Sequence, residues 1–460
     1  MGRKVQNQPE AEKKTNKDKV IDIRLGIFFD GTSNNKLNIF EYRNPEQYQS
    51  RWTKKYHEFK RWTSISYKSD FSNVAKLSDF YQQEKKDNEY FGAIYIEGIA
   101  TAPREKDTDP GGFDDYMAAA TGMGELGING KVERACQKII EKIQYLLRNR
   151  GNSETVEIKT LKLDVFGFSR GAAAARRFVS CIEKPSGERI RHRGRYPSYY
   201  DVCLRDVLKK KGKSLPPVNR IQPCFLGLFD TVSSYGLNFK DDVKELTLGV
   251  SKPEMVVQLV AADEYRKNFA LTRIKTANGK SKELILPGEH CDIGGSHNDG
   301  VQEKTVLKQE KTIVHHNMVQ TLPAIYNGYK TLEQLLEEGW INSKDEKIRV
   351  VSNKYSVIPL LLMIKFQQNL FVENLFDKNN VDDIEILQNL KERIDRIENN
   401  PLYQFKCTVP EQIKPLFQKD DADFMLLKNI RHRYLHLSAG GGLVNSPAKN
   451  NIRLIIDDSK

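Results

Sequence analysis

A serine between two glycines forms the segment of this sequence best suited to chemistry. Residues 167–171 are Gly-Phe-Ser-Arg-Gly, which fits the pattern G-x-S-x-G. In a nucleophile elbow such a serine, here Ser169, lies in a strained turn between a strand and a helix. The flanking Gly167 and Gly171 let the two elements pass closely, because a Cβ at either position would clash. The alternative is a glycine-flanked turn with a bystander serine.

A nucleophilic serine needs a base to take its proton and a carboxylate to orient that base. On a parallel sheet these residues come in the order Ser, Asp or Glu, His, each after a strand. Asp230 directly follows the apolar residues 225–229, and His290 follows a Pro-Gly pair after residues 283–286. The pattern therefore predicts Ser169 as nucleophile, His290 as base and Asp230 as acid.

Alternatives remain for both partners of the serine. Asp230 could be a turn-forming aspartate, which is common after strands, and Asp292 could orient a histidine or cap a turn. His297 and His436 are rivals to His290, because both lie near glycine-rich sequence. The remaining histidines lie in charged or helical contexts and are predicted to be surface or packing residues; they are His57, His192, His315, His316 and His432.

An oxyanion formed at this serine would need two backbone N–H donors. The residue after the nucleophile, Arg170, supplies one. The second is expected from the loop after the first predicted strand, Asp30-Gly31-Thr32, where the glycine lets the backbone approach a substrate.

A metal site is the alternative use of the polar residues at the strand ends. Asp30, Asp230, His290 and Asp292 are possible ligands, but no H-E-x-x-H or similar spacing accompanies them. We therefore predict neither a metal nor a cofactor.

The elements that must hold these residues alternate between strand and helix. Amphipathic residues 131–149 predict a helix, as does the alanine-rich segment after Ser169, and residues 255–271 are also predicted to be helical. Apolar segments predict strands at 21–29, 91–97, 161–166, 224–229 and 283–286. This order predicts an α/β fold: a doubly wound, mostly parallel sheet with helical insertions and a helical C-terminal region.

The chain divides into three predicted parts. Residues 1–20 are polar and predict a disordered lead-in, and residues 21–300 predict the catalytic core. Residues 301–460 are predicted to be mostly helical, with amphipathic helices at 332–339 and 381–399. Sheet-like sequence at 434–436 and 452–456 predicts a return to the core.

Composition limits the possible partners and compartment. The 460 residues are 39% hydrophobic and 29% charged, with a net charge of +12, but no nucleic-acid-binding motif accompanies the charge. The six cysteines are scattered and predict reduced thiols. Residues 1–19 lack the apolar region of a signal peptide, so we expect synthesis in the cytoplasm without one, and no nucleic-acid partner.

A basic insertion at residues 181–220 follows the predicted elbow helix. It is either a solvated surface or a platform for anionic lipid headgroups, where each basic residue contributes roughly 1 kcal/mol. Its basic residues, interleaved with Tyr196, Tyr199 and Tyr200, are Arg189, Arg191, Arg193, Arg195, Arg205, Lys209, Lys210, Lys211 and Lys213.

Four segments resemble the signature blocks of one known family, the type VI secretion lipase effectors of the first lipase family, which are α/β-hydrolase-fold phospholipases. They are residues 28–34 (FFDGTSN), 167–172 (GFSRGA), 228–232 (LFDTV) and 286–295 (LPGEHCDIGG), in the family's order. A weaker block is 260–266, and the resemblance covers roughly residues 20–300. Phe229 replaces the family's usual tryptophan, Gln258 a frequent histidine, and Leu437 a frequent aspartate after His436.

The resemblance implies the triad Ser169, Asp230 and His290 and attack on a phospholipid ester. It also implies delivery by a type VI spike or tube carrier to the periplasm of a rival bacterium, peripheral membrane contact there, and a cognate immunity protein. We therefore predict a serine ester hydrolase acting on membrane phospholipids. The alternatives are a serine esterase on a soluble or glycan ester and a hydrolase-fold interaction module without turnover.

Overall fold

The computed structural model describes most of residues 20–48, 64–148, 156–183, 203–277, 281–367, 422–439 and 445–459, with short gaps inside several of these ranges. The predicted lead-in up to residue 19, residues 184–202 and 211–214 of the basic insertion, and the predicted helix at 381–399 lie outside the described residues.

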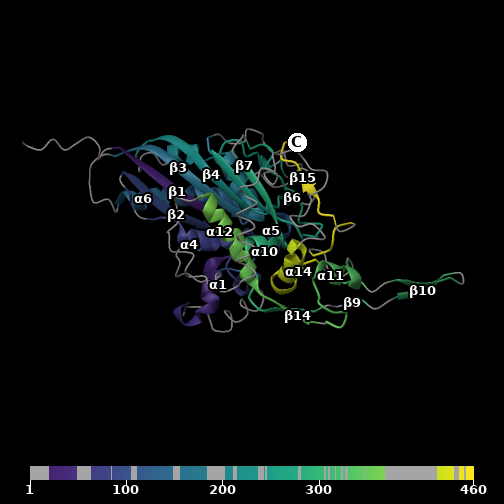
Figure 1. Ribbon diagram of the computed structural model, residues 1–460. Coiled ribbons are helices and arrows are strands. Elements are labelled where there is room, and N and C mark those ends of the chain that lie inside the picture. The colour runs from purple at the N-terminus through teal and green to yellow at the C-terminus, as the bar shows by residue number, and fades with distance from the viewer. Residues whose placement is uncertain are drawn as a thin grey trace, which may run out of the picture.

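Six parallel strands form the central sheet, in the order β2-β1-β3-β4-β5-β7 (Figure 1). β2 lies on one side of β1, and β3 and the later strands lie on the other side. The direction in which strands are added therefore reverses between β1 and β3, and sheets of this kind bind ligands at the carboxyl ends of the strands at such a switch point. This sheet confirms the predicted α/β fold. The strands are β1 (Val20–Phe29), β2 (Glu89–Ile96), β3 (Glu157–Phe168), β4 (Val218–Phe229), β5 (Met255–Ala261) and β7 (Ser281–Leu286).

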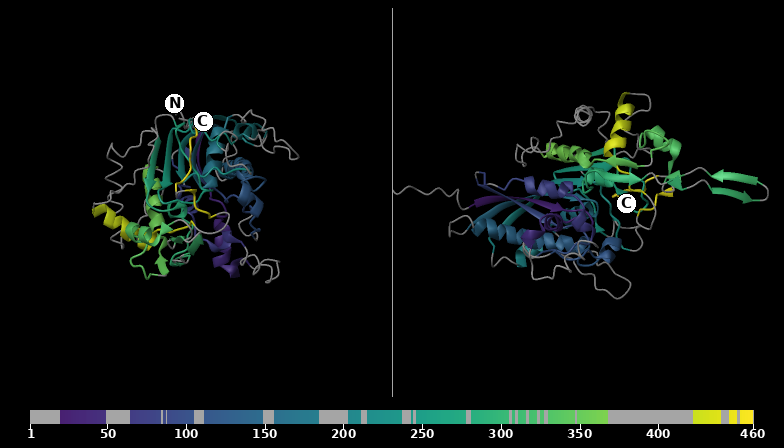
Figure 2. Two further views of the ribbon diagram at one scale, coloured as in Figure 1. Left: turned by 90° about the vertical axis from the view of Figure 1, so that its right-hand side faces the viewer. Right: turned by 90° about the horizontal axis from the view of Figure 1, so that it is seen from below.

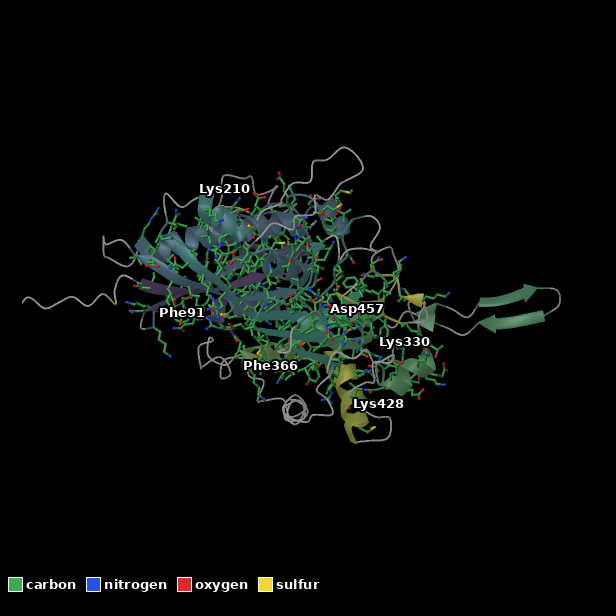
Figure 3. The ribbon with its side chains drawn as sticks, turned by 90° about the horizontal axis from the view of Figure 1, so that it is seen from above. Phe91, Lys210, Lys330, Phe366, Lys428 and Asp457 are labelled. Carbon is green, nitrogen blue, oxygen red and sulfur yellow. The ribbon has the colours of Figure 1, made fainter. Side chains whose placement is uncertain are left out.

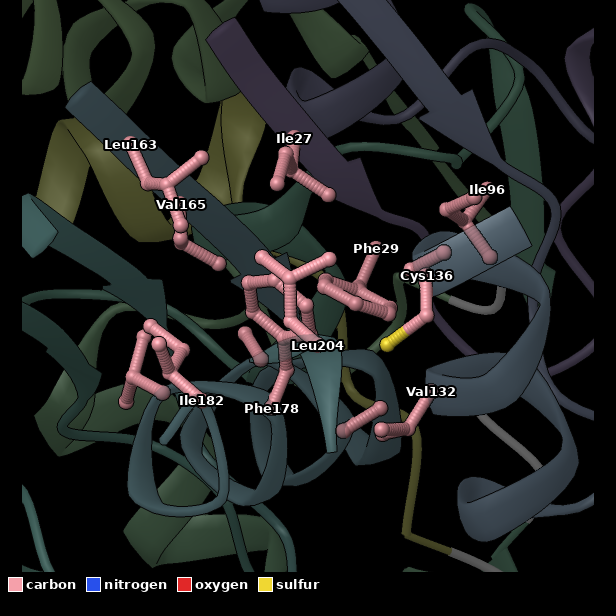
Figure 4. Packing of buried hydrophobic residues seen from close by; sticks show 14 of the residues in the cluster. Ile27, Phe29, Ile96, Val132, Cys136, Leu163, Val165, Phe178, Ile182 and Leu204 are labelled. Carbon is pink, nitrogen blue, oxygen red and sulfur yellow. The ribbon is translucent and has the colours of Figure 1, made fainter. Parts of the chain in front are cut away.

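Alternating side chains give the sheet two buried faces. On one face, side chains such as Ile27, Phe29 and Val165 pack against α6 (Ile128–Arg148) and α7 (Arg170–Ser180), as Figure 4 shows. On the other face, Phe28, Phe166 and Phe225 pack against α4 (Asn73–Phe80) and α12 (Val357–Phe366). Helices therefore cover both faces, as a doubly wound fold requires.

The remaining helices connect or flank the strands of the sheet. They are α1 (Lys36–Arg43), η2 (Pro45–Tyr48), α3 (Ile65–Lys68), α5 (Tyr116–Thr121), α8 (Leu204–Lys210), α10 (His290–Gly294), α11 (Leu332–Glu338), η3 (Asn353–Ser356) and α14 (Ala422–Tyr434). No helix in the described ranges combines the length and apolar character needed to cross a bilayer.

The prediction of a helix over residues 255–271 is wrong. Residues 255–261 are β5, and β6 (Leu271–Thr272) follows after a loop. The run Met-Val-Val-Gln-Leu-Val-Ala is nearly continuous in apolar residues because β5 is covered on both faces, as strands inside parallel sheets are. The charged residues that suggested a helix, such as Asp263 and Glu264, lie in the loop.

The described part of residues 301–331 is not helical, although the sequence predicts a mostly helical region from residue 301 onward. Short strands occupy this part, and the hairpin of β10 and β11 extends away from the sheet (Figures 1 and 2). The helices α11, α12 and α14 follow, while residues 434–436 end a helix and form no strand. The further strands are β8 (Val301–Lys304), β9 (Leu307–Lys308), β10 (Lys311–His315), β11 (Met318–Leu322), β12 (Ile325–Tyr326), β13 (Lys330–Thr331), β14 (Ile348–Val351) and β15 (Ile455–Ile456).

Candidate active site

Ser169 lies in the sharp turn between the end of β3 and the start of α7. Its backbone has φ 58° and ψ −129°, a conformation that side-chain-bearing residues rarely adopt. The Ser169 amide donates to the carbonyl of Phe229 at 3.1 Å, and the Ser169 carbonyl accepts from the Ala172 amide at 3.0 Å. Neighbouring strand and helix thus hold the serine in its strained turn.

The two glycines around Ser169 have no room for a side chain. A Cβ at Gly167 would lie 2.6 Å from Cα of Ala172, and one at Gly171 would lie 2.1 Å from the carbonyl oxygen of Asp30. Both clashes involve backbone, which has no rotamer by which to move away. The elbow therefore depends on glycine at both positions.

Asp230 and His290 meet at the same edge of the sheet. Asp230 follows β4 with φ 44°, and His290 is the first residue of α10, after β7. Nδ1 of His290 lies 2.6 Å from Oδ2 of Asp230, and both side chains are buried. The arrangement matches the acid–base pair of a serine hydrolase.

His290 lies beside the elbow. Its ring centroid is 4.6 Å from that of Phe168, the residue that precedes Ser169, and the ring of Phe269 meets it edge-on at 5.0 Å. Nε2 of His290 is buried and has no hydrogen-bond partner among the described residues, so a bond to Ser169 is not formed in this conformation. Catalytic hydrogen bonds often tighten only when substrate binds.

A fourth residue, Arg453, holds the carboxylate of Asp230. Its Nη1 donates to Oδ1 at 2.8 Å and its Nη2 to Oδ2 at 2.7 Å, while the amide of Ala261 donates to Oδ1 at 3.0 Å. Burial raises the pKa of Asp230, but the charge of Arg453 and the hydrogen bond from His290 outweigh it and hold that pKa well below its usual range. Asp230 is therefore ionised at neutral pH.

Asp292, the alternative acid, has other partners. Its Oδ1 lies 2.7 Å from Nδ1 of His436, and its Oδ2 accepts from the amides of Glu289 and His436 at 3.0 Å each. It thereby completes the capping box of α10 with Glu289. The structure therefore places Asp230, and not Asp292, against the imidazole of His290.

The rival histidines, His297 and His436, stack on each other with ring centroids 3.8 Å apart. Nε2 of His297 lies 2.6 Å from Oε1 of Glu289. Burial lowers the pKa of His297, but the Glu289 carboxylate more than offsets this and raises it. These histidines form a cluster behind α10 that holds the two capping carboxylates.

This cluster includes two groups of possible metal ligands, of which one is disfavoured by its ring geometry and the other by its thiol. The groups are Glu289, Cys291 and His297, and Asp292, His297 and His436, with ligand atoms within 4.8 Å of one another. The stacked imidazoles are tilted by only 21°, so an ion in the plane of one ring lies outside the plane of the other. Burial raises the pKa of Cys291 well above its usual value, which disfavours the thiolate that a metal needs.

The Asp30–Thr32 loop is held by its own first residue. The carboxylate of Asp30 accepts from the Gly31 amide at 2.8 Å, the Ser72 hydroxyl at 2.5 Å and the Tyr95 hydroxyl at 2.6 Å, and the Asp30 amide donates to Ile96. These bonds occupy the amides of Asp30 and Gly31. Of the three loop residues predicted to supply the second oxyanion donor, Thr32 is the one whose amide these bonds leave available.

Arg170 connects this loop to the elbow. Its Nε donates to Oγ1 of Thr32 at 2.8 Å, and its Nη2 donates to the carbonyl of Ala119. Burial lowers the pKa of the guanidinium to about 10, which leaves it charged at neutral pH. The backbone amide of Arg170 opens α7 and so has no carbonyl partner within the helix. The side chain thus fixes Thr32 relative to this second amide.

Comparison with known proteins places the chain in a family. Residues 24–321 match the family described as the catalytic domain of Tle1-like phospholipase effectors of the type VI secretion system (T6SS). The comparison with curated proteins gave no match.

Two solved structures are similar to this chain. One is the Tle1 effector bound to the VgrG spike from the type VI secretion system, with TM-score 0.58 and 21% identity over 95% of this chain and 94% of that chain. At this identity the likeness concerns the fold alone. The other, an uncharacterized protein from Pseudomonas aeruginosa, has TM-score 0.30 and 20% identity over 61% of this chain and 42% of that chain. Because the family match spans well over half of the sequence, the chain belongs to the Tle1-like phospholipase effectors of the type VI secretion system.

Proposed function

We propose that this effector is a serine ester hydrolase that cleaves acyl esters of membrane phospholipids, with Ser169 as nucleophile, His290 as base and Asp230 as acid. The observation that carries the proposal is the 2.6 Å contact between buried Asp230 and His290 beside the strained elbow serine. A phospholipase family supplies the substrate class.

In the first half-reaction, Oγ of Ser169 attacks the acyl carbonyl while Nε2 of His290 takes the hydroxyl proton. The carbonyl oxygen becomes an oxyanion and receives hydrogen bonds from the amides of Arg170 and Thr32. His290 then gives its proton to the departing glycerol oxygen. The ester bond breaks and an acyl-enzyme remains.

In the second half-reaction, His290 takes a proton from water, and the hydroxide attacks the acyl carbonyl. The tetrahedral intermediate collapses, the fatty acid leaves, and Ser169 recovers its proton from His290. Asp230 keeps the imidazole in the tautomer that presents an unprotonated Nε2 and stabilises the imidazolium in both half-reactions.

The delivery route and partners form the second part of the proposal. A VgrG-type spike is the carrier that the similar Tle1 structure suggests, and a cognate immunity protein would protect the producing cell. We place the enzyme's action in the periplasm of a target bacterium, at the membrane surface. Co-purification of the chain with its spike protein, and loss of killing when the spike is deleted, would test this route.

The described part of the basic insertion offers exposed charge for that surface. Lys209 and Lys210 are exposed at the end of α8 (Figure 3 labels Lys210), whereas Arg205 is neutralised by Glu183 at 2.9 Å. Reversing the charge of Lys209, Lys210 and Lys211 should weaken binding to anionic vesicles. Unchanged binding would mean that these lysines form only a solvated face.

Hydrolysis of phospholipid vesicles tests the central activity. The intact protein should release fatty acid from vesicles, and Ser169→Ala should abolish the release. Release from short soluble esters but never from vesicles would instead support the soluble esterase. Absence of release from both substrates would favour the interaction module without turnover.

A further inference from the structure

The C-terminal residues 452–458 lie along the carboxyl edge of the sheet, next to the candidate site. β15 pairs in parallel with β6, and the pairing is extended by bonds from the Leu271 amide to the Leu454 carbonyl and from the Arg273 amide to the Ile456 carbonyl, both 2.9 Å. Figure 1 shows this yellow segment beside β6, and Figure 3 labels Asp457 within it. We call residues 452–458 the C-terminal strap.

Arg453 is the strap residue that enters the site. Besides its two bonds to the Asp230 carboxylate, its Nε donates to the carbonyl of Phe269 at 2.7 Å and its Nη1 to that of Ala261 at 3.3 Å. Its side chain is 8% exposed. Every nitrogen of the guanidinium is therefore bonded within the site, which fixes its plane.

Arg453 supports two of the residues that contact the imidazole of His290, Asp230 and Phe269. Asp230 contacts Nδ1 of His290, and the ring of Phe269 meets the imidazole edge-on. One guanidinium thus binds the side chain of Asp230 and the backbone of Phe269. Loss of that guanidinium would release both contacts at once.

The far end of the strap is fixed to the elbow helix. Asp458 accepts from Arg176 of α7 at 2.7 Å, and both side chains are 0% exposed. Asp458 also accepts from the hydroxyl of Thr276 at 2.6 Å, while the neighbouring Asp457 pairs with Lys275 at 2.5 Å. The strap therefore joins the helix behind the nucleophile to the acid of the proposed triad.

We propose that Arg453 is a positioning residue that the C-terminal strap inserts to fix the Asp230–His290 pair, so that hydrolysis depends on the strap. This inference rests on the proposed function. Bidentate binding to a rigid guanidinium leaves the Asp230 carboxylate a single orientation, with Oδ2 directed at Nδ1 of His290. The positive charges of Arg453 and of protonated His290 both interact with that carboxylate.

The positive charge of Arg453 next to Asp230 should affect the pH dependence of hydrolysis. Asp230 faces Arg453 of the strap and His290 of α10, and Glu264 accepts from the His290 amide at 3.4 Å. Without Arg453, the protonated imidazole becomes the only cation bonded to Asp230 among the described residues, and this favours the protonated form of the imidazole. Since the base must be unprotonated, activity should be lost at a higher pH on the acid side.

Steady-state hydrolysis by Arg453→Ala in the full-length protein tests this. We expect kcat to fall by about a hundredfold with little change in KM, because a misplaced imidazole affects the reaction more than lipid binding. The acid limb of the pH–rate profile should move up by about one pH unit. Arg453→Lys, which keeps the charge without the bidentate geometry, should restore the acid limb while kcat recovers only in part.

Asp457→Asn is the matched control, because it lies in the same strap but contacts Lys275 and not the site. It should leave both kcat and the acid limb unchanged. If Arg453→Ala does not fold, as judged by circular dichroism, Arg453→Lys and Arg453→Gln carry the same comparison. Unaltered kcat and pH profile in folded Arg453 variants, with Ser169→Ala inactive, would overturn this inference alone, whereas an active Ser169→Ala would overturn the proposed function as well.

Discussion

Two carboxylate–imidazole pairs each include one residue of α10, and by contact geometry the pairs are nearly identical. Asp230 and His290 are 2.6 Å apart, and Asp292 and His436 are 2.7 Å apart, with Nδ1 of the histidine as the contact atom in each. All four side chains are buried, and within the described part of the chain neither histidine has a partner for Nε2. A buried Asp–His contact is therefore insufficient to identify a catalytic pair.

The charges around the two pairs distinguish them. Asp230 faces the guanidinium of Arg453, which overcomes the effect of burial and holds its pKa well below the usual range. Burial raises the pKa of Asp292, and the neighbouring Glu289 carboxylate adds to this, against the opposing effect of His436. Arg453 thus stabilises the negative charge of Asp230 beside His290, whereas burial and Glu289 disfavour the negative charge of Asp292 beside His436.

The surroundings of the two imidazoles also differ. His290 packs on Phe168 next to the elbow serine, whereas His436 is stacked on His297 and its aspartate caps α10. Since α10 carries His290 at its first position, the second pair supports the first. The difference suggests that a nucleophile and a fixed counter-cation, rather than the pair itself, give an Asp–His contact its catalytic role.

Replacement of each histidine by alanine should give the largest difference in kcat between the two pairs. We expect His290→Ala to lower kcat for phospholipid hydrolysis by about 10⁴-fold or more, because the general base is lost. His436→Ala should lower it by less than about tenfold. Initial rates of fatty-acid release from vesicles measure both, and equal losses in two folded variants would contradict the assignment of roles.

The two aspartates should differ by nearly as much. Asp230→Asn is expected to lower kcat by about 10⁴-fold, because the amide favours the wrong tautomer of His290. Asp292→Asn keeps an oxygen that can cap α10, so it should lower kcat by less than about tenfold. The same assay, with circular dichroism as the folding control, distinguishes them. If Asp292→Asn were the more damaged enzyme, the acid of the triad would have to be reassigned.

The contributions of the two aspartates to the free energy of unfolding should change with pH in opposite directions. A raised pKa means that Asp292 stabilises the fold fully below about pH 4, its unfolded value, and that this contribution is lost as pH rises through the raised value. The advantage of the wild type over Asp292→Asn, measured as the free energy of unfolding, should therefore shrink as pH increases from about 4.

The contribution of Asp230, whose pKa is lowered, is present above about pH 4 and is lost only as pH falls further. Urea unfolding across this range measures both differences. An advantage over Asp292→Asn that grew with pH would show that the charged form of this residue is the stabilised one.

The smallest effect is expected at the stacked imidazole. His297→Gln removes the stack with His436, but Glu289 keeps its bonds from Arg266 at 2.9 Å and from the Cys291 amide at 3.0 Å. We expect the free energy of unfolding to fall by about 1 kcal/mol and hydrolysis to change by less than about tenfold. A loss of activity near that of His290→Ala, in a folded variant, would place this cluster within the chemistry.

Local sequence patterns were sufficient for most of the sheet and for the proposed triad. Glycines around Ser169, and polar residues directly after apolar runs, are short-range signals of an elbow and of strand ends. The strand at 255–261 was missed because a buried parallel strand lacks alternation and the charged residues after it resembled a helix face. The amide of Gly31 is engaged by the side chain of Asp30, a contact that composition does not reveal.

Arg453 was beyond prediction for a different reason. It lies 223 residues from Asp230, as a single arginine among the apolar Ile452, Leu454 and Ile455. Such a pattern predicts a short strand and leaves open what its one charged side chain meets. Only the pairing of β15 with β6 brings Arg453 to the acid.

Covalent labelling with a fluorophosphonate, mapped by mass spectrometry, tests the proposed triad most directly. We expect one adduct, on Ser169, that forms far more slowly in His290→Ala and at nearly the wild-type rate in His436→Ala. An adduct on another residue, or phospholipid hydrolysis that continues in Ser169→Ala, would contradict it.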